Sequence, residues 1–162
     1  MAEFTYNPVQ TVQPNHPIVL NTSIGCPNGY VLHRNESGIV TLRGIVNNPC
    51  GCFARYQVTC NCNIAIPSDG IAPAPISIAL ALDGEPILTS RAIVTPADTA
   101  SETPSTDSTN FFNVTSTAII TVPRGCCFNV SVENTSESTE PAETPAPPIL
   151  VQNANLTVAR IA

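Results

Sequence analysis

The chain has 162 residues, 43% of them hydrophobic, which is enough for one domain with a sizeable core. Charged residues make up only 11%, against a usual share of about 25%, all six basic residues are arginine, and the net charge is −6. The chain has no basic cluster and no apolar run approaching the length of a membrane span, so neither nucleic acid nor a membrane is an expected partner. The N-terminus lacks the pattern of a secretory signal, so we expect synthesis in the cytoplasm without a signal peptide.

Residues 1–17 contain Pro8, Pro14 and Pro17. Proline has no N–H to donate to a neighbouring strand. We therefore predict an extended N-terminal arm over residues 1–17, with at most a short edge strand, followed by a single domain over residues 18–162. The first strands of that domain are expected at residues 18–20, 30–33 and 39–46.

Residues 53–66, FARYQVTCNCNIAI, form the longest run in which side-chain character alternates. A period of two is typical of a strand, because successive side chains point to opposite faces. One face would carry Phe53, Arg55, Gln57, Thr59, Asn61 and Asn63, and the other Ala54, Tyr56, Val58, Cys60, Cys62 and Ile64.

Residues 75–96 predict a hairpin. Strands flank a turn at Asp83-Gly84, where positive φ is tolerated. One face of its first strand is hydrophobic, and the other carries the small residues Ser77, Ala79 and Ala81. Small residues allow close packing, so we expect a neighbouring subunit against this second face.

Two acidic loops rich in Ser and Thr, at residues 97–109 and 134–148, separate the remaining strands, and we expect both at the surface. Those strands are expected at residues 111–122, 126–133 and 149–161. About ten short strands with frequent turns and no helical period favour an antiparallel sandwich or barrel. The predicted fold is all-β, an antiparallel jelly-roll sandwich.

Seven cysteines are the strongest candidates for a chemical role: Cys26, Cys50, Cys52, Cys60, Cys62, Cys126 and Cys127. The two CxC pairs could form a four-thiolate zinc site, but zinc ribbons usually place CxxC pairs in tight turns. Disulfides within the chain among Cys50, Cys52, Cys60 and Cys62 are a better interpretation, because neighbouring strands bring side chains within reach of a bridge. Cys26, Cys126 and Cys127 are the candidates for bonds between subunits. The alternative is that all seven are buried free thiols, as cytoplasmic synthesis favours.

Catalysis has little support in the sequence. His16 and His33 are the only histidines, and both are expected at the surface. Half of the carboxylates fall in the two acidic loops, at Asp98, Glu102, Asp107, Glu137, Glu140 and Glu143. Carboxylates on flexible loops are not held at the fixed separation that an acid/base pair needs. We therefore predict neither an enzyme nor a cofactor or metal site.

Several segments resemble a group of small β proteins from gut-dwelling Firmicutes and their phages: GIVTLRGI, NIAIP, PISIALALDGEPI, FFNVTSTAIITVPRGCCFNVSVENTS and ILVQNANLTVARIA. The resemblance covers most of the chain from about Gly38. It implies a jelly roll of the tumour-necrosis-factor or complement type, a fold that usually forms trimers through apolar faces. Similar domains are attached to collagen-like spore-surface proteins and to phage head fibres or decorations, although this chain has no Gly-X-Y stalk.

The expected function is that of a non-enzymatic structural protein of an extracellular particle, foremost a phage virion subunit such as a capsid decoration or head fibre. Its expected partners are copies of itself, as a trimer, and the major capsid protein or fibre neighbours. The alternative is a subunit of a cysteine-cross-linked bacterial surface or spore-associated fibre. A carbohydrate-binding module or hydrolase is disfavoured, because sugar platforms are usually aromatic and aromatic residues make up only 5% of the chain. The expected location is the virion or the cell exterior.

Overall fold

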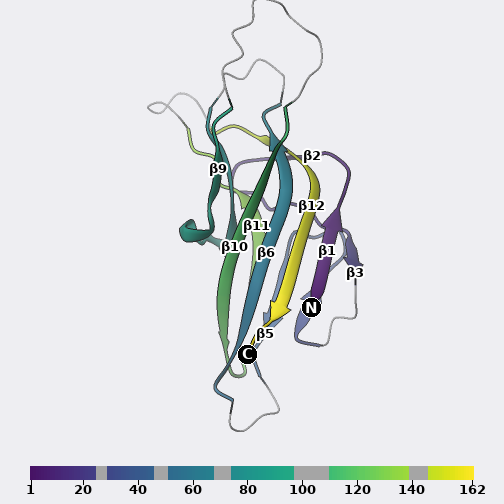
Figure 1. The fold of residues 1–162 in the computed structure, drawn as a ribbon. Helices are drawn as coiled ribbons and strands as arrows, with labels where there is room; N and C mark the ends of the chain where they lie inside the picture. Colours follow the sequence, from purple (N-terminus) through teal and green to yellow (C-terminus); the bar gives the residue numbers. More distant parts are fainter. Residues whose placement is uncertain (25–28, 46–50, 68–73, 97–109, 139–145) are drawn as a thin grey trace, which may run out of the picture.

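The alternating segments fold into two antiparallel sheets packed face to face (Figure 1). The computed structural model describes residues 1–24, 29–45, 51–67, 74–96, 110–138 and 146–162. The front sheet, which faces the viewer in Figure 1, has the order β10-β6-β12-β1-β3, with β2 also paired to β12. The back sheet has the order β4-β5-β11-β7-β8, with β9 also paired to β7.

The front sheet consists of β1 (Ala2–Tyr6), β2 (Gln10–Val12), β3 (Thr22–Ile24), β6 (Phe53–Ala65), β10 (Phe112–Pro123) and β12 (Ile149–Arg160). The back sheet consists of β4 (Val31–His33), β5 (Val40–Arg43), β7 (Ile76–Leu82), β8 (Glu85–Pro86), β9 (Ala92–Val94) and β11 (Cys127–Asn134). From β5 to β12 the chain alternates between the sheets, in the order β5, β6, β7, β10, β11 and β12, leaving aside the short β8 and β9. This all-β, antiparallel jelly-roll sandwich confirms the predicted fold class. In the described ranges, no helix is long and apolar enough to span a membrane.

The hydrophobic core lies between the sheets and follows the period of two. Along β6, the even-numbered side chains from Ala54 to Ile64 are buried, whereas most odd-numbered ones are exposed. The turn after β7 is also as predicted, with φ of 50° at Asp83 and 86° at Gly84, and Leu82 pairs with Glu85 across it. Positive φ at both central residues matches the right-handed twist of a two-residue hairpin.

The N-terminal segment forms more strand pairs than its prolines predict. β1 pairs with β12 on one side and with β3 on the other, and β2 pairs with β12 as well. The expectation of at most a short edge strand in residues 1–17 is therefore wrong. The prolines fall outside β1 and β2, so they remove no hydrogen bond from these two strands.

Two further expectations need correction. The second arm of the hairpin is not continuous, because the 3₁₀ turn η1 (Leu88–Ser90) separates β8 from β9. In the loop expected at residues 134–148, β11 continues to Asn134, and Thr135 and Ser136 are also buried. The loop at residues 97–109 lies outside the described residues.

The small face of β7 is already covered in the single chain. Ser77, Ala79 and Ala81 have no exposed surface. Ser77 receives a hydrogen bond from Arg91 Nε at 3.0 Å, and β7 lies between β11 and the short strands β8 and β9. The expected neighbouring subunit cannot pack against these three residues, so any interface lies elsewhere.

Candidate functional site

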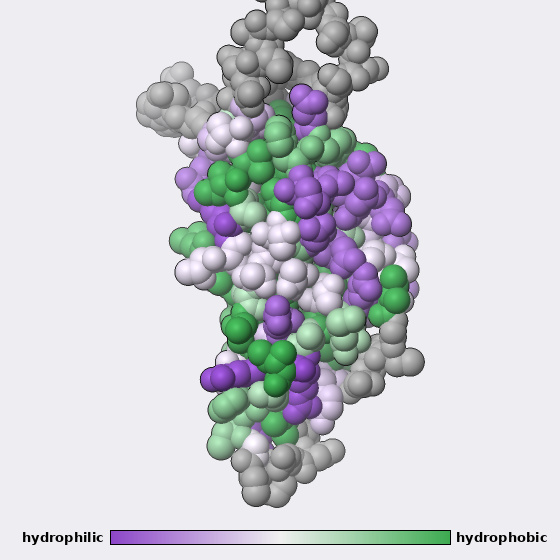
Figure 2. All heavy atoms as spheres, in the orientation of Figure 1, coloured by the Kyte–Doolittle hydropathy of each residue, from purple (hydrophilic) through white to green (hydrophobic). Residues whose placement is uncertain are grey.

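The outward side of the front sheet is a broad, mostly uncharged surface, here called the front face. Its members, assigned by strand register and alternation, are Glu3, Thr5, Phe53, Arg55, Gln57, Thr59, Asn61, Asn63, Asn113, Thr115, Thr117, Ile119, Thr121, Asn155, Thr157 and Ala159. Figure 2 shows hydrophilic and intermediate residues over its middle and hydrophobic residues gathered toward its ends. Among these side chains only Glu3 and Arg55 are charged.

Hydrogen bonds between strands hold the polar side chains of the front face in place. Asn61 Nδ2 donates to Thr115 Oγ1 at 2.8 Å, and Asn113 Nδ2 donates to Asn63 Oδ1 at 3.0 Å. The hydroxyl groups of Thr59 and Thr117 lie 3.0 Å apart. These side chains have already lost much of their rotamer freedom, which lowers the entropy cost of docking a partner on this face.

Two large apolar side chains project from the same surface. Ile119 is 67% exposed, on the edge strand β10, and Phe53 is 41% exposed, at the start of β6. Apolar side chains surrounded by neutral polar ones, with few charges, are typical of the central part of a protein–protein interface. The front face therefore has the composition of an assembly surface.

The cysteines divide into a buried pair and an exposed group. Cys60 and Cys62 lie on the inner side of β6, with 1% and 0% of their surface exposed. Their hydrogen bond, together with burial, raises the pKa of the Cys60 thiol well above its ordinary value of 9.0. Both thiols are free. A thiol held in the protonated state is a poor nucleophile, so Cys60 has the properties of a core residue, and Cys62 is fully buried beside it.

The predicted bridges from Cys52 to Cys60 or Cys62 are wrong. β6 runs without interruption from Phe53, so Cys52 and Cys60 are separated by roughly 26 Å of extended chain. A four-thiolate zinc site over these cysteines fails for the same reason. Among the described residues, no three His, Cys, Asp or Glu side chains are placed to hold a metal ion. Cys26 and Cys50 lie outside those residues, and pairings that involve them stay predictions.

Cys52, Cys126 and Cys127 are exposed free thiols at one end of the sandwich, here called the thiol end. The turn from Pro123 to Cys126 lies against the residue before β6, because the Arg124 amide donates to the Cys52 carbonyl at 2.9 Å. Figure 1 places the start of β6 and the turn between β10 and β11 at this end. The tertiary structure brings together cysteines more than 70 residues apart, a proximity that spacing along the chain does not reveal.

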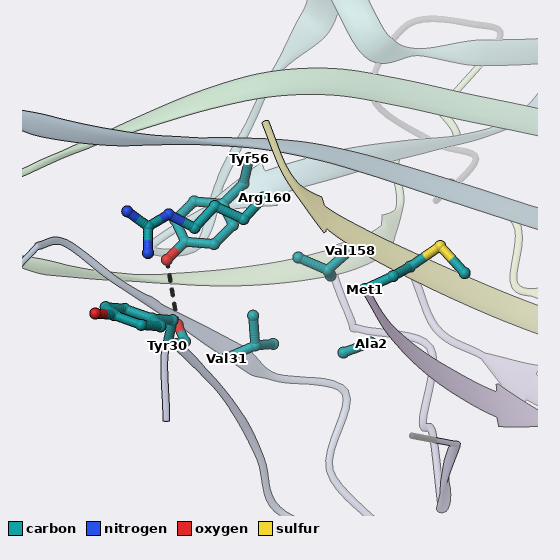
Figure 3. Close-up of a pocket in the computed structure, with 7 residues that line it drawn as sticks. All are labelled: Met1, Ala2, Tyr30, Val31, Tyr56, Val158 and Arg160. Atoms are coloured by element: carbon teal, nitrogen blue, oxygen red, sulfur yellow. Dashed lines mark hydrogen bonds between the residues drawn. The ribbon is translucent and has the colours of Figure 1, made fainter. Parts of the chain in front are cut away.

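A cavity of about 160 Å³, here called the end pocket, opens between the sheets near the end of β12. It is lined by Met1, Ala2, Tyr30, Val31, Tyr56, Val158 and Arg160; in Figure 3 Tyr30, Tyr56 and Arg160 lie together on one side of it and Met1, Ala2 and Val158 on the other. The Tyr56 hydroxyl donates to the Arg43 carbonyl at 2.5 Å. Burial raises the pKa of Tyr56, and the nearby charge of Arg160 opposes that effect. The sequence analysis missed this pocket, although alternation already places Arg160 in the row of Leu156 and Val158.

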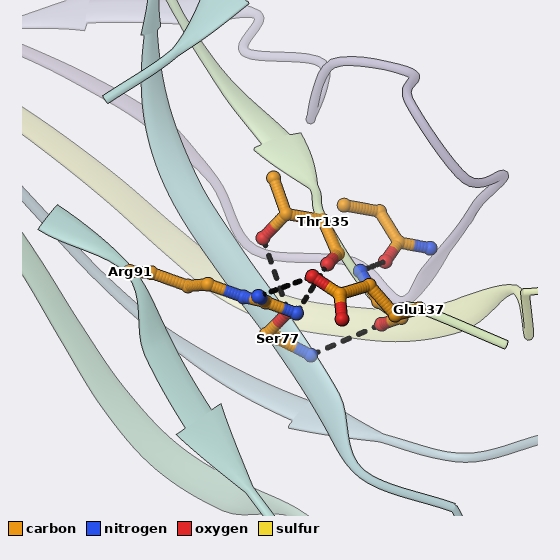
Figure 4. Close-up of polar contacts among 6 residues, drawn as sticks. Ser77, Arg91, Thr135 and Glu137 are labelled. Carbon is orange, nitrogen blue, oxygen red and sulfur yellow. Dashed lines mark hydrogen bonds and ion pairs between the residues drawn. The ribbon is translucent and has the colours of Figure 1, made fainter. Parts of the chain in front are cut away.

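Arg91 organises a polar cluster at the edge of the back sheet (Figure 4). Its guanidinium donates to Ser77 Oγ at 3.0 Å, to the Thr135 carbonyl at 2.8 Å and to Glu137 Oε1 at 2.5 Å. Ser77 and Thr135 also share a hydrogen bond at 3.0 Å. All three guanidinium nitrogens of Arg91 donate to protein atoms, so the cluster fixes the segment after β11.

The histidines and carboxylates do not form a reaction centre in the described part of the chain. His16 is exposed and contacts the Pro14 carbonyl at 2.9 Å. His33 packs on the Phe4 ring, and its nitrogens contact the Ser37 carbonyl and the Ser23 hydroxyl. Of the acidic loop residues, Glu137 is paired with Arg91; the other five named above lie outside the described residues.

Comparison with known proteins gives a likeness of fold only. No family model matches the chain, and no curated protein matches it. Among the solved structures that match is the globular domain of zebrafish complement 1qA protein, at 15% sequence identity and a TM-score of 0.47. The match covers 96% of this chain and 94% of the zebrafish chain.

Proposed function

We propose that the protein is a non-enzymatic structural subunit of an extracellular particle and that it assembles with copies of itself, as a trimer, through the front face. The observation that carries this proposal is the front face itself. Apart from Glu3 and Arg55 its polar side chains are neutral, several of them are held by hydrogen bonds, and exposed Ile119 and Phe53 lie among them. Such a surface costs little to dehydrate compared with a charged one, because an ion loses far more solvation energy than a hydroxyl or amide.

The particle we propose is a phage virion, with this chain as a capsid decoration or head-fibre subunit. Support comes from the sequence segments that resemble phage and spore-surface jelly rolls. Its other partners would then be the major capsid protein or fibre neighbours, and its location the virion.

Light scattering at micromolar concentration tests the assembly. We expect a mass of about three times 17.0 kDa. Ile119→Arg should reduce the mass to that of one chain, because it places a charge within the apolar contact. Ile39→Arg is the matched control, since Ile39 is 46% exposed next to β5 in the back sheet. A wild-type monomer, or equal effects of the two substitutions, would contradict assembly through the front face.

The thiol end favours a second candidate function, a subunit of a cysteine-cross-linked fibre. Cys52, Cys126 and Cys127 are exposed and free, so they can contact another subunit without unfolding. Each bond would join two thiols from different subunits, which together give up two protons and two electrons to an oxidant such as a small-molecule disulfide. Small-molecule disulfides are abundant outside cells and scarce as oxidants in the cytoplasm, which fits assembly after release.

Denaturing electrophoresis without reductant separates the two candidates. A ladder of multimers that collapses on reduction supports the fibre, whereas a single monomer band supports the virion subunit. In the fibre case, replacing Cys52, Cys126 and Cys127 together by serine should remove most of the ladder. Cys60→Ser is the control, because a buried thiol cannot cross-link folded subunits. A ladder that survives the triple substitution would place the bonds at other cysteines.

A further inference from the structure

We propose that the end pocket binds a small monocarboxylate with an apolar body of about six carbons, with the carboxylate on Arg160 and the apolar body between the two sheets. This binding site is independent of the assembly proposed above. It rests on the size of the cavity, on its lining, and on the position of one arginine.

The cavity has the size and lining for a small apolar group. Its volume of about 160 Å³ is close to that of an engineered apolar cavity of about 150 Å³ in another protein, which binds benzene. Val158, Val31 and Ala2 are 1%, 7% and 6% exposed, so the walls are fixed parts of the core. Burial of a ring or a short chain against them removes apolar surface from water on both sides.

Arg160 gives the pocket a charge at its mouth. Alternation along β12 places it in the row of Leu156 and Val158, which face the core, but at the last residue of the strand its side chain is exposed. Its guanidinium lies 4.5 Å from the centre of the Tyr30 ring, and Figure 3 shows it beside the Tyr56 hydroxyl. Stacking on the ring limits its rotation, which prepares the planar group for a ligand.

Charge complementarity selects the ligand. Among the described residues, the salt bridge between an arginine and a carboxylate side chain joins Arg91 to Glu137, so it does not involve Arg160. Arg160 Nε donates to the Ala162 backbone oxygen at 3.2 Å, and among the described residues the guanidinium makes no other hydrogen bond, which leaves its two terminal nitrogens for a carboxylate. A guanidinium binds a carboxylate through two parallel hydrogen bonds.

The lining disfavours more polar anions and sugars. A sugar or a phosphate ester would bring several hydroxyl groups or oxygens against valine and alanine, where they would lose their hydrogen bonds with water. Tyr56 is already committed to the Arg43 carbonyl, and its raised pKa keeps it neutral at ordinary pH, so it does not repel an anion. One charged end and an apolar body therefore fit best.

Ligand-observed NMR titration with benzoate tests the proposal. We expect saturable binding at one site per chain. Benzamide has nearly the same shape without the charge, and it should bind about tenfold more weakly. Arg160→Gln should weaken benzoate binding about tenfold and leave benzamide nearly unchanged. Arg34→Gln is the matched control, since it makes the same change in net charge at an exposed site outside the pocket.

Three results would overturn the site. They are a lack of saturation at millimolar benzoate, equal binding of benzoate and benzamide, and equal effects of Arg160→Gln and Arg34→Gln. The last would mean that net charge, rather than the pocket, attracts the anion. Denaturant midpoints of both variants verify that they are folded, and light scattering of the same samples reports assembly separately.

Discussion

Replacing Gly44 by alanine is expected to lower the free energy of unfolding by about 4 kcal/mol or more. Gly44 follows β5, and its amide donates to the Cys126 carbonyl at 2.9 Å. A Cβ at this position would lie 2.0 Å from the Pro123 carbonyl oxygen and 2.9 Å from its carbonyl carbon. Both atoms are backbone at the end of β10, so no side chain can rotate to relieve the clash. The two sheets would have to separate where β5 meets the turn after β10.

Gly84→Ala is the matched control. Gly84 has φ of +86° and nothing within 4 Å of its added Cβ, so only backbone strain is introduced. That strain costs roughly 1–2 kcal/mol. Urea unfolding with an unchanged denaturant slope measures both values. Equal losses for the two variants would show that the approach of Gly44 to Pro123 is not close in solution.

Stability should fall as the pH rises above about 9, because the buried Cys60 thiol holds its proton more tightly in the folded state. Its hydrogen bond with Cys62, its burial and the charge of Cys62 all raise its pKa above the ordinary 9.0. Below that pH the thiol is protonated in both states and stability is unaffected. Above it the unfolded chain loses the proton first, so the free energy of unfolding falls by up to about 1.4 kcal/mol per pH unit. Tyr56, whose pKa is also raised, adds to the loss above about pH 10.

Cys60→Ala tests this dependence, with Cys52→Ala as the control at an exposed cysteine. Unfolding free energies measured from pH 8 to pH 10.5 should fall less steeply for Cys60→Ala than for the wild type. The Cys52 variant should follow the wild type. A Cys60 variant that retains the full slope would assign the alkaline loss to other groups.

The sequence alone determined which side chains face the core along the long strands, because alternation is a local property of the extended chain. The pattern of residues 53–66 predicted the buried row from Ala54 to Ile64, and Asp83-Gly84 predicted the turn with positive φ. The same pattern predicted that Cys60 and Cys62 are buried, independently of whether they form disulfides. Alternation also predicts which side chains of each front-sheet strand point outward. Only the pairing of the strands brings these mostly uncharged side chains together on one face.

Only the tertiary structure decided which segments pair and which ends meet. β1 lies against β12, about 150 residues away, and a proline-rich segment gives no local sign of that pairing. Cys52 is far from Cys60 along one strand and close to the turn before Cys126, the opposite of what sequence spacing favours. The end pocket joins Tyr30 before β4, Tyr56 in β6 and Arg160 at the end of β12. Each of these features depends on register between distant strands, which is set by the shared core and not by any short stretch of residues.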